Sequence, residues 1–114
     1  MKEQTVKLYR AMVVNGLREC TFNEYYQRTI SLYYHGETII GAYWDNDDSI
    51  WIDAIINSAF KPDLGVINTW LKSLTVCTDE IYARATNLYI RQWLRLAGFK
   101  KGADGVYRWS LYMI

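Results

Sequence analysis

Two carboxylates are the residues whose type best suits acid–base chemistry. Asp53 lies within an apolar run, and Glu80 opens a later run in which apolar and polar residues alternate. A carboxylate held beside a reacting amine can take up its proton as a general base. The alternative interpretation, which the sequence leaves open, is that both are solvated surface carboxylates. Asp53 and Glu80 are therefore the catalytic candidates.

The other reactive side chains form no recognisable motif. His35 is the only histidine and is expected in a surface turn beside Gly36, with no second ligand in pattern. Cys20 and Cys77 are expected to be buried free thiols, and the sequence leaves open a disulfide between them. The acidic residues within 45–48 lack the glycine and distal glutamate of a calcium loop. We therefore predict no metal site and no serine or cysteine nucleophile.

Composition favours one folded domain spanning residues 1–114. The chain is 51% hydrophobic and 16% aromatic, with 10 tyrosines and 5 tryptophans, which is too apolar for a disordered chain. This aromatic excess suits a packed core, and it equally suits a surface that binds another protein. The formal net charge is +1 without a basic patch, so we expect no nucleic-acid partner. We find neither a signal-peptide core nor an apolar run of membrane-spanning length, so we expect a cytoplasmic protein with no membrane partner.

The elements that would position the carboxylates are clearest after residue 28. Runs of β-branched and aromatic residues predict strands, and apolar residues three or four apart predict helices. Asp63 and Asn87 are placed to cap the two later helices, and Gly98 is placed to end the last one. Strands are expected at 29–34, 38–44, 49–56, 80–85 and 106–112, helices at 5–17, from 64 to about 77 and at 88–97, and a loop at 100–105. Residues 18–28 are ambiguous.

The order of these elements predicts the topology. Three consecutive strands joined by short turns indicate an antiparallel meander. The strand–helix–strand unit that follows indicates a parallel pair joined by a crossover. The sequence therefore predicts the α+β class, with a mixed sheet built from a meander and then β-α-β-α-β.

This order, together with the segment from Asn87 to Gly98-Phe99, resembles the acyl-CoA-binding half of the GCN5-related N-acetyltransferase (GNAT) fold. Members of that family often have an asparagine before the last helix and Gly-Phe after it, and Gly98 follows Asn87 by the family's usual eleven residues. The resemblance covers residues 29–112. Residues 1–28 diverge and are too short for the strand and two helices with which the family begins.

The resemblance implies a place for acetyl-CoA. In the family, backbone N–H groups at the start of the first long helix hold the pyrophosphate, where a helix N-terminus favours an anion. Here Pro62 has no backbone donor, and Ile67 stands where the family has a small residue, so the motif is eroded. The cofactor-binding residues that the resemblance implies are Lys61, Gly65, Val66 and Asn87.

The last helix departs from the enzymes in a second way. Many of them have a tyrosine seven residues after the asparagine, which protonates the departing thiolate, and this chain has Leu94 there. The pair Trp93-Leu94 resembles small GNAT-like internal virion proteins of short-tailed bacteriophages. We therefore expect a phage-encoded protein that binds a virion or host protein, in the host cytoplasm or the virion. The alternative is an active acetyl-CoA-dependent N-acetyltransferase acting on a small amine or a protein.

Overall fold

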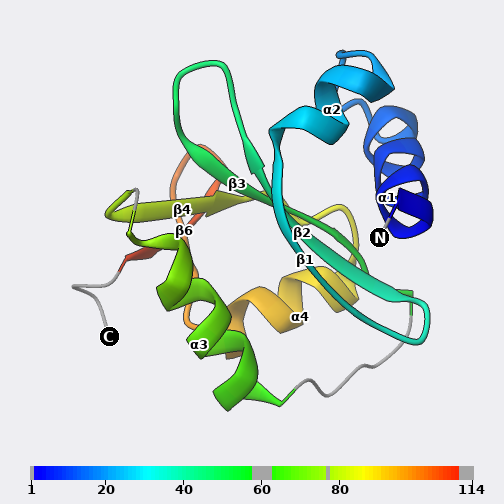
Figure 1. The fold of residues 1–114 in the computed structure, drawn as a ribbon. Helices are drawn as coiled ribbons and strands as arrows, with labels where there is room; N and C mark the ends of the chain where they lie inside the picture. Colours follow the sequence, from blue (N-terminus) through cyan, green and yellow to red (C-terminus); the bar gives the residue numbers. More distant parts are fainter. Residues whose placement is uncertain (1, 58–62, 77, 111–114) are drawn as a thin grey trace.

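The computed structural model describes residues 2–57, 63–76 and 78–110, which form four helices and one six-stranded mixed sheet (Figure 1). This is the α+β class that the sequence predicts. The helices are α1 (Lys2–Val14), α2 (Phe22–Arg28), α3 (Leu64–Leu74) and α4 (Leu88–Leu96). The strands are β1 (Thr29–His35), β2 (Thr38–Trp44), β3 (Ile50–Ile55), β4 (Glu80–Ala83), β5 (Lys100–Lys101) and β6 (Tyr107–Ser110).

The sheet has the order β1-β2-β3-β4-β6-β5, with one parallel pair. β1, β2 and β3 form the predicted antiparallel meander. β3 and β4 run parallel and are paired from Ile50 opposite Ile81 to Ile52 opposite Ala83. β3 continues to Ile55 without a partner on β4, so the two strands pair only over the first half of β3.

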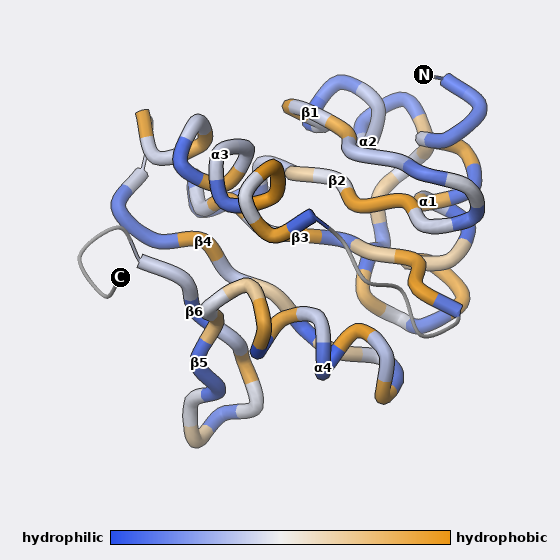
Figure 2. Tube along the Cα trace, turned by 90° about the horizontal axis from the view of Figure 1, so that it is seen from below, coloured by the Kyte–Doolittle hydropathy of each residue, from blue (hydrophilic) through white to orange (hydrophobic). Residues whose placement is uncertain are grey.

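Helices cover both faces of the sheet. Ile50, Ile52 and Ala54 belong to the larger core cluster, which also contains the buried side chains of α3 and α4. Ile55, on the other face, packs against a smaller cluster formed with α1 and α2. Figure 2 shows the hydrophobic segments of β2 and β3 in the middle of the molecule, with α3 and α1 on opposite sides. The alternation along β3 therefore sends Asp53 toward the α1–α2 side.

Local signals place the two later helices where the sequence predicts them. The side chain of Asp63 accepts hydrogen bonds at the start of α3, and that of Asn87 does so at the start of α4. Gly98 follows α4 with φ 98°, a conformation that favours glycine, and Phe99 is buried beyond it. Gly41 lets α1 pack closely on β2, because a Cβ at this position would lie 2.6 Å from the Leu8 side chain of α1.

Several predicted boundaries were wrong. The first helix runs from Lys2 to Val14 rather than over 5–17, because Gly16 adopts φ 69° and ends it. The ambiguous stretch contains α2, capped by the Thr21 side chain. Residues 2–28 thus hold two helices and no strand. His35 ends β1 rather than lying in the turn, β4 stops at Ala83, and the expected loop at 100–105 begins with β5. The last predicted strand, 106–112, is observed as β6 from Tyr107 to Ser110, and residues 111–112 lie outside the described residues.

Candidate functional site

A cleft of about 430 Å³ opens between the α1–α2 connection and the face of β3 that Asp53 occupies. Residues from the connection line one side, including Arg18 and Cys20, and β3 lines the other with Trp51 to Ala54. The turn after β2 and the residues after β4 close its ends with Asp45, Asn46, Arg84 and Thr86. The volume suits a small ligand or one side chain of a partner protein.

Asp53 is the predicted catalytic candidate that lies in this cleft, and it is fully engaged. Its side chain is 4% exposed, and Arg18 donates two hydrogen bonds to it, from Nε at 3.1 Å and Nη2 at 2.8 Å. The Tyr25 hydroxyl donates a third at 2.8 Å. The interpretation of Asp53 as a solvated surface carboxylate is therefore wrong.

Burial dominates the electrostatics of this group. Burial raises the pKa of Asp53, while the charge of Arg18 and the hydrogen bond from Tyr25 lower it and offset part of that rise. Burial also raises the pKa of Tyr25, and the neighbouring Asp53 charge raises it further, so Tyr25 remains a neutral donor. A paired, hydrogen-bonded carboxylate tied to two other elements is a structural anchor rather than a free base.

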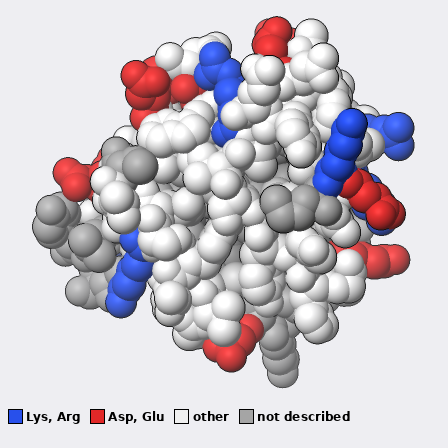
Figure 3. Space-filling model, in the orientation of Figure 1, with Lys and Arg blue, Asp and Glu red and all other residues white. Residues whose placement is uncertain are grey.

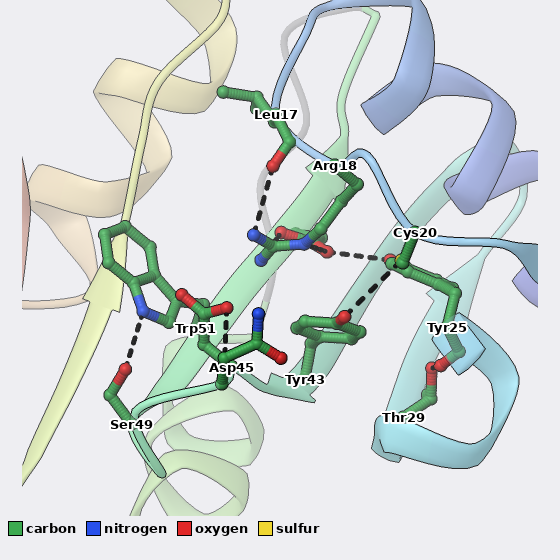
Figure 4. A network of polar contacts seen from close by, with 11 residues as sticks. Leu17, Arg18, Cys20, Tyr25, Thr29, Tyr43, Asp45, Ser49 and Trp51 are labelled. Carbon is green, nitrogen blue, oxygen red and sulfur yellow. Dashed lines mark hydrogen bonds and ion pairs between the residues drawn. The ribbon is translucent and has the colours of Figure 1, made fainter.

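A second set of contacts surrounds Arg18. Its guanidinium carbon lies 4.3 Å from the centre of the Tyr43 ring, and the Tyr43 hydroxyl lies 3.5 Å from the Cys20 sulfur. Burial raises the pKa of Tyr43, and the contact with Cys20 adds to the rise. Figure 4 shows Arg18 reaching from the α1–α2 connection over Tyr43, with Asp45 and Trp51 nearby. Cys20 is a free thiol as expected, but it is half-buried rather than buried, and Cys77 lies outside the described residues.

The sequence interpretation missed Arg18, Tyr25 and Tyr43. One signal was available: a charged residue inside an otherwise apolar strand needs a buried partner if that face is covered. The partner could not be chosen, because Arg18 lies 35 residues before Asp53 in the chain.

The rim of the cleft carries more negative than positive groups. Glu19, Glu24 and Asp45 line it, and no ion pair among the described residues involves them. Arg84 opposes them, with its guanidinium carbon 5.1 Å from the centre of the Trp51 ring. Beyond the Arg18–Asp53 pair, the cleft thus offers carboxylates to a cationic group, while the Trp51 ring is already in contact with Arg84.

Glu80, the other catalytic candidate, does not line this cleft. It begins β4, is partly exposed, and accepts a hydrogen bond from the Tyr82 hydroxyl at 2.8 Å. That bond is the main cause of the raised pKa of Tyr82. The two predicted catalytic carboxylates are therefore not brought together in one site.

The start of α3 contains Gly65 and Val66, two of the predicted cofactor-binding residues. The backbone N–H groups of Gly65 and Val66 donate to Oδ1 of Asp63, at 3.0 and 3.3 Å. These are the groups that the resemblance assigns to a pyrophosphate, and here a carboxylate of the chain itself occupies them. Lys61 and Pro62 lie outside the described residues.

Asn87, the fourth predicted cofactor residue, connects two elements. Its Oδ1 accepts from the Ile90 N–H at 2.9 Å, and its Nδ2 donates to the Ile56 carbonyl at 3.1 Å. Asn87 thereby ties the start of α4 to the end of β3, beyond the point where β3 and β4 stop pairing. Leu94 on the same helix is fully buried in the larger core cluster.

Comparisons with protein-family models, curated proteins and solved structures find no match for this chain. The relationship to the GNAT family therefore stays a prediction. Among residues 2–57, 63–76 and 78–110, no three His, Cys, Asp or Glu side chains gather in a group that could hold a metal ion. None of the helices in these ranges is long and apolar enough to cross a membrane.

Proposed function

We propose that this chain is a GNAT-like protein that acts by binding another protein and does not transfer acetyl groups. The family part of the proposal is supported by the strand order, by the parallel pair of β3 and β4, and by the helix between Asn87 and Gly98. The proposed lack of acetyl transfer is supported by the contacts that Asp63, Asp53 and Leu94 make within the fold.

The capping of α3 by Asp63 is the observation that carries the proposal. A bound pyrophosphate would need the N–H groups of Gly65 and Val66, and both already donate to the Asp63 carboxylate. An incoming phosphate would have to displace that side chain, and it would be repelled by the displaced charge. The helix N-terminus is thus satisfied internally, and its affinity for an external anion is low.

The proposed loss of catalysis rests on two further positions. Asp53 is held by Arg18 and Tyr25, so abstracting a proton from an amine would require breaking a buried ion pair. Leu94 is buried where the family's enzymes have their tyrosine, and it cannot protonate a thiolate. Asp53 and Leu94 therefore supply no free group for the two steps of an acetyl transfer, and Glu80, the remaining candidate, does not line the cleft.

The cleft is the proposed contact with the partner. Its acidic rim suits a lysine or arginine side chain projecting from a protein, by charge attraction. In line with the resemblance to phage proteins, we propose a virion or host protein as the partner, met in the host cytoplasm or the virion.

Calorimetric titration of acetyl-CoA tests the cofactor part. Wild type is expected to give no binding heat at millimolar ligand, whereas Asp63→Ala, which frees the two N–H groups, is expected to bind at least about tenfold more tightly. Asp79→Ala removes an exposed carboxylate elsewhere and is the matched control. Tight binding of acetyl-CoA by wild type would overturn the proposal.

The protein-binding part is tested by charge reversal in the cleft. Proteins captured by the immobilised chain from phage-infected cells are compared with those captured by a Glu24→Lys/Asp45→Lys variant and by Asp79→Lys. The partner is expected to be retained by Asp79→Lys and lost by the cleft variant. Equal capture by all three would exclude the cleft as the contact.

An acetyltransferase acting on a small amine or a protein is the second candidate function. The observation that favours it is the same acidic, aromatic cleft, which would hold a cationic acceptor amine. Polyamines, aminoglycosides and peptide amines offered with acetyl-CoA would reveal it, and robust turnover of any of them would establish this function instead.

A further inference from the structure

The cleft beside Asp53 carries charges of opposite sign at its two ends. Asp45 lies at the end formed by the turn after β2, and Glu19 and Glu24 also lie on the rim. Arg84 lies at the other end, among the residues that follow β4. Figure 3 shows acidic side chains at the upper edge of the molecule, where Figure 1 places the β2–β3 turn and α2. A ligand in the cleft would therefore meet carboxylates and a guanidinium at different points.

The floor between these groups is electrically balanced. Arg18 and Asp53 form an ion pair at 2.8 Å, and both side chains are largely buried. The Arg18 guanidinium also lies over the Tyr43 ring, with its carbon 4.3 Å from the ring centre. Since each charge of this pair is already matched by the other, the pair offers a ligand little net attraction. The rim carboxylates and Arg84 therefore decide which charges the cleft attracts.

Arg84 is held in place without using its hydrogen-bond donors on an acid. Its guanidinium carbon lies 5.1 Å from the centre of the Trp51 ring, a contact made through the ring face. The three ion pairs within the described part of the chain do not involve Arg84. A guanidinium in this situation suits a carboxylate, which it can bind through two parallel hydrogen bonds. Thr86 lines the same end and brings a hydroxyl group.

We propose that the cleft binds the C-terminal residue of its partner, a lysine or arginine, with the terminal carboxylate on Arg84 and the side-chain cation on the rim carboxylates. This inference rests on the proposed function and names the partner's segment. A C-terminal basic residue carries both charges within one residue, and a cleft of about 430 Å³ has room for one residue rather than a folded element. A basic residue inside a chain has no carboxylate of its own, so it would bring its cation near Arg84 without compensation.

Two peptides that differ only at the terminal carboxylate test this proposal. Acetyl-Gly-Gly-Arg with a free carboxylate is titrated calorimetrically into the full chain, beside the same peptide ending in an amide. Wild type is expected to bind the free acid at least about tenfold more tightly. A citrulline in place of the peptide's arginine removes the side-chain charge and is expected to weaken binding of the free acid. Equal binding of the acid and the amide would overturn the proposal and leave the cationic contact of the proposed function intact.

Two further outcomes separate this inference from the proposed function. Binding of none of the peptides at millimolar concentration would overturn both the terminal residue and the cleft as a contact. An amidated peptide with an internal Arg-Asp pair that binds as tightly as the free acid would overturn the assignment to a chain end.

Variants of the chain locate the carboxylate. Arg84→Met is expected to bind the acid and the amide equally, because the group that distinguishes them has been removed. Asp45→Asn is expected to weaken both peptides and to keep the preference for the acid. Arg91→Met changes an exposed arginine of α4 and is the matched control, which should behave like wild type. Thermal melts establish that all the variants are folded. A preference for the free acid that survives in Arg84→Met would overturn the proposal.

Discussion

Replacement of Arg18 by methionine should destabilise the protein more than most single changes. The variant removes both hydrogen bonds at 2.8 and 3.1 Å from Asp53 and leaves that carboxylate, 4% exposed, with only the Tyr25 hydroxyl. Removing one partner of a buried ion pair costs about 3–5 kcal/mol, because the remaining charge is buried without compensation. A domain of this size has a total stability of about 5–15 kcal/mol, so the loss is a large share of it.

Urea denaturation at pH 7, followed by tryptophan fluorescence and circular dichroism, measures this loss. The comparison is a cycle of Arg18→Met, Asp53→Asn and the double variant. We expect the double variant to be more stable than Arg18→Met alone, because the buried charge has also been removed. A loss below about 1 kcal/mol for Arg18→Met, or additive effects in the cycle, would refute the assignment of Asp53 as a buried anchor.

The pH dependence of this loss has a definite sign. Burial raises the pKa of Asp53 in the folded state, and without Arg18 the main influence lowering it is gone. A group whose folded pKa is raised contributes stability at low pH that is lost as pH rises through the folded pKa. The deficit of Arg18→Met should therefore shrink on acidification, as Asp53 takes up a proton. A deficit that grows toward acid pH would contradict this reasoning.

Four smaller predictions follow from individual contacts. Asn87→Ala should cost about 1–3 kcal/mol of unfolding free energy through loss of the α4 cap and the bond to β3, while Asn87→Asp, which keeps the cap, should cost less. Gly41→Ala should cost about 1–3 kcal/mol in urea denaturation, because its Cβ would lie 2.6 Å from a side chain of α1. Leu94→Tyr should lower the melting temperature by overpacking the core and should produce no acetyl transfer in an acetyl-CoA assay. NMR titration should give Asp104 a pKa of about 2, because its hydrogen bonds from Arg108 lower it. Arg108→Gln should return the pKa of Asp104 toward 3.8. The stability that this pair contributes is therefore present above pH 3.8 and is lost as the pH falls through 2.

The parts of the fold that the sequence predicts well are those set by local chemistry. α4 is the clearest case, because a capping asparagine, an apolar stripe and a terminal glycine all lie within one short segment. The strands of the meander carry their own β-branched and aromatic residues. β5 has two residues, both lysine, and its strand conformation depends entirely on pairing with β6. The apolar spacing from Tyr9 to Leu17 predicts a helix that continues past Gly16, but Gly16 adopts φ 69° and α1 ends before it.

The candidate site was harder to predict because its contacts are long-range. Asp53 was identified by type, but whether it faced solvent depended on how α1 and α2 cover the sheet. The ion pair with Arg18 spans 35 residues, and the bond from Tyr25 spans 28. Neither spacing has a sequence pattern. The capping of α3 by Asp63 is predicted from the local sequence. The structure adds that this carboxylate accepts from the N–H groups of both Gly65 and Val66.

Three polar residues hold elements of the fold together, and this role connects the fold to the proposed function. Asp53 joins β3 to the α1–α2 side, Asn87 joins α4 to the end of β3, and Asp63 closes the start of α3. The proposed loss of acetyl transfer agrees with this use, because Asp53 and the N–H groups that Asp63 occupies would otherwise have to stay available to substrate and cofactor. The rim carboxylates of Glu19, Glu24 and Asp45 form no ion pair with these three residues, so they stay available to a partner. Under the proposed function, selection for stability acts on these three residues and selection for recognition acts on the rim, so the two act on different residues.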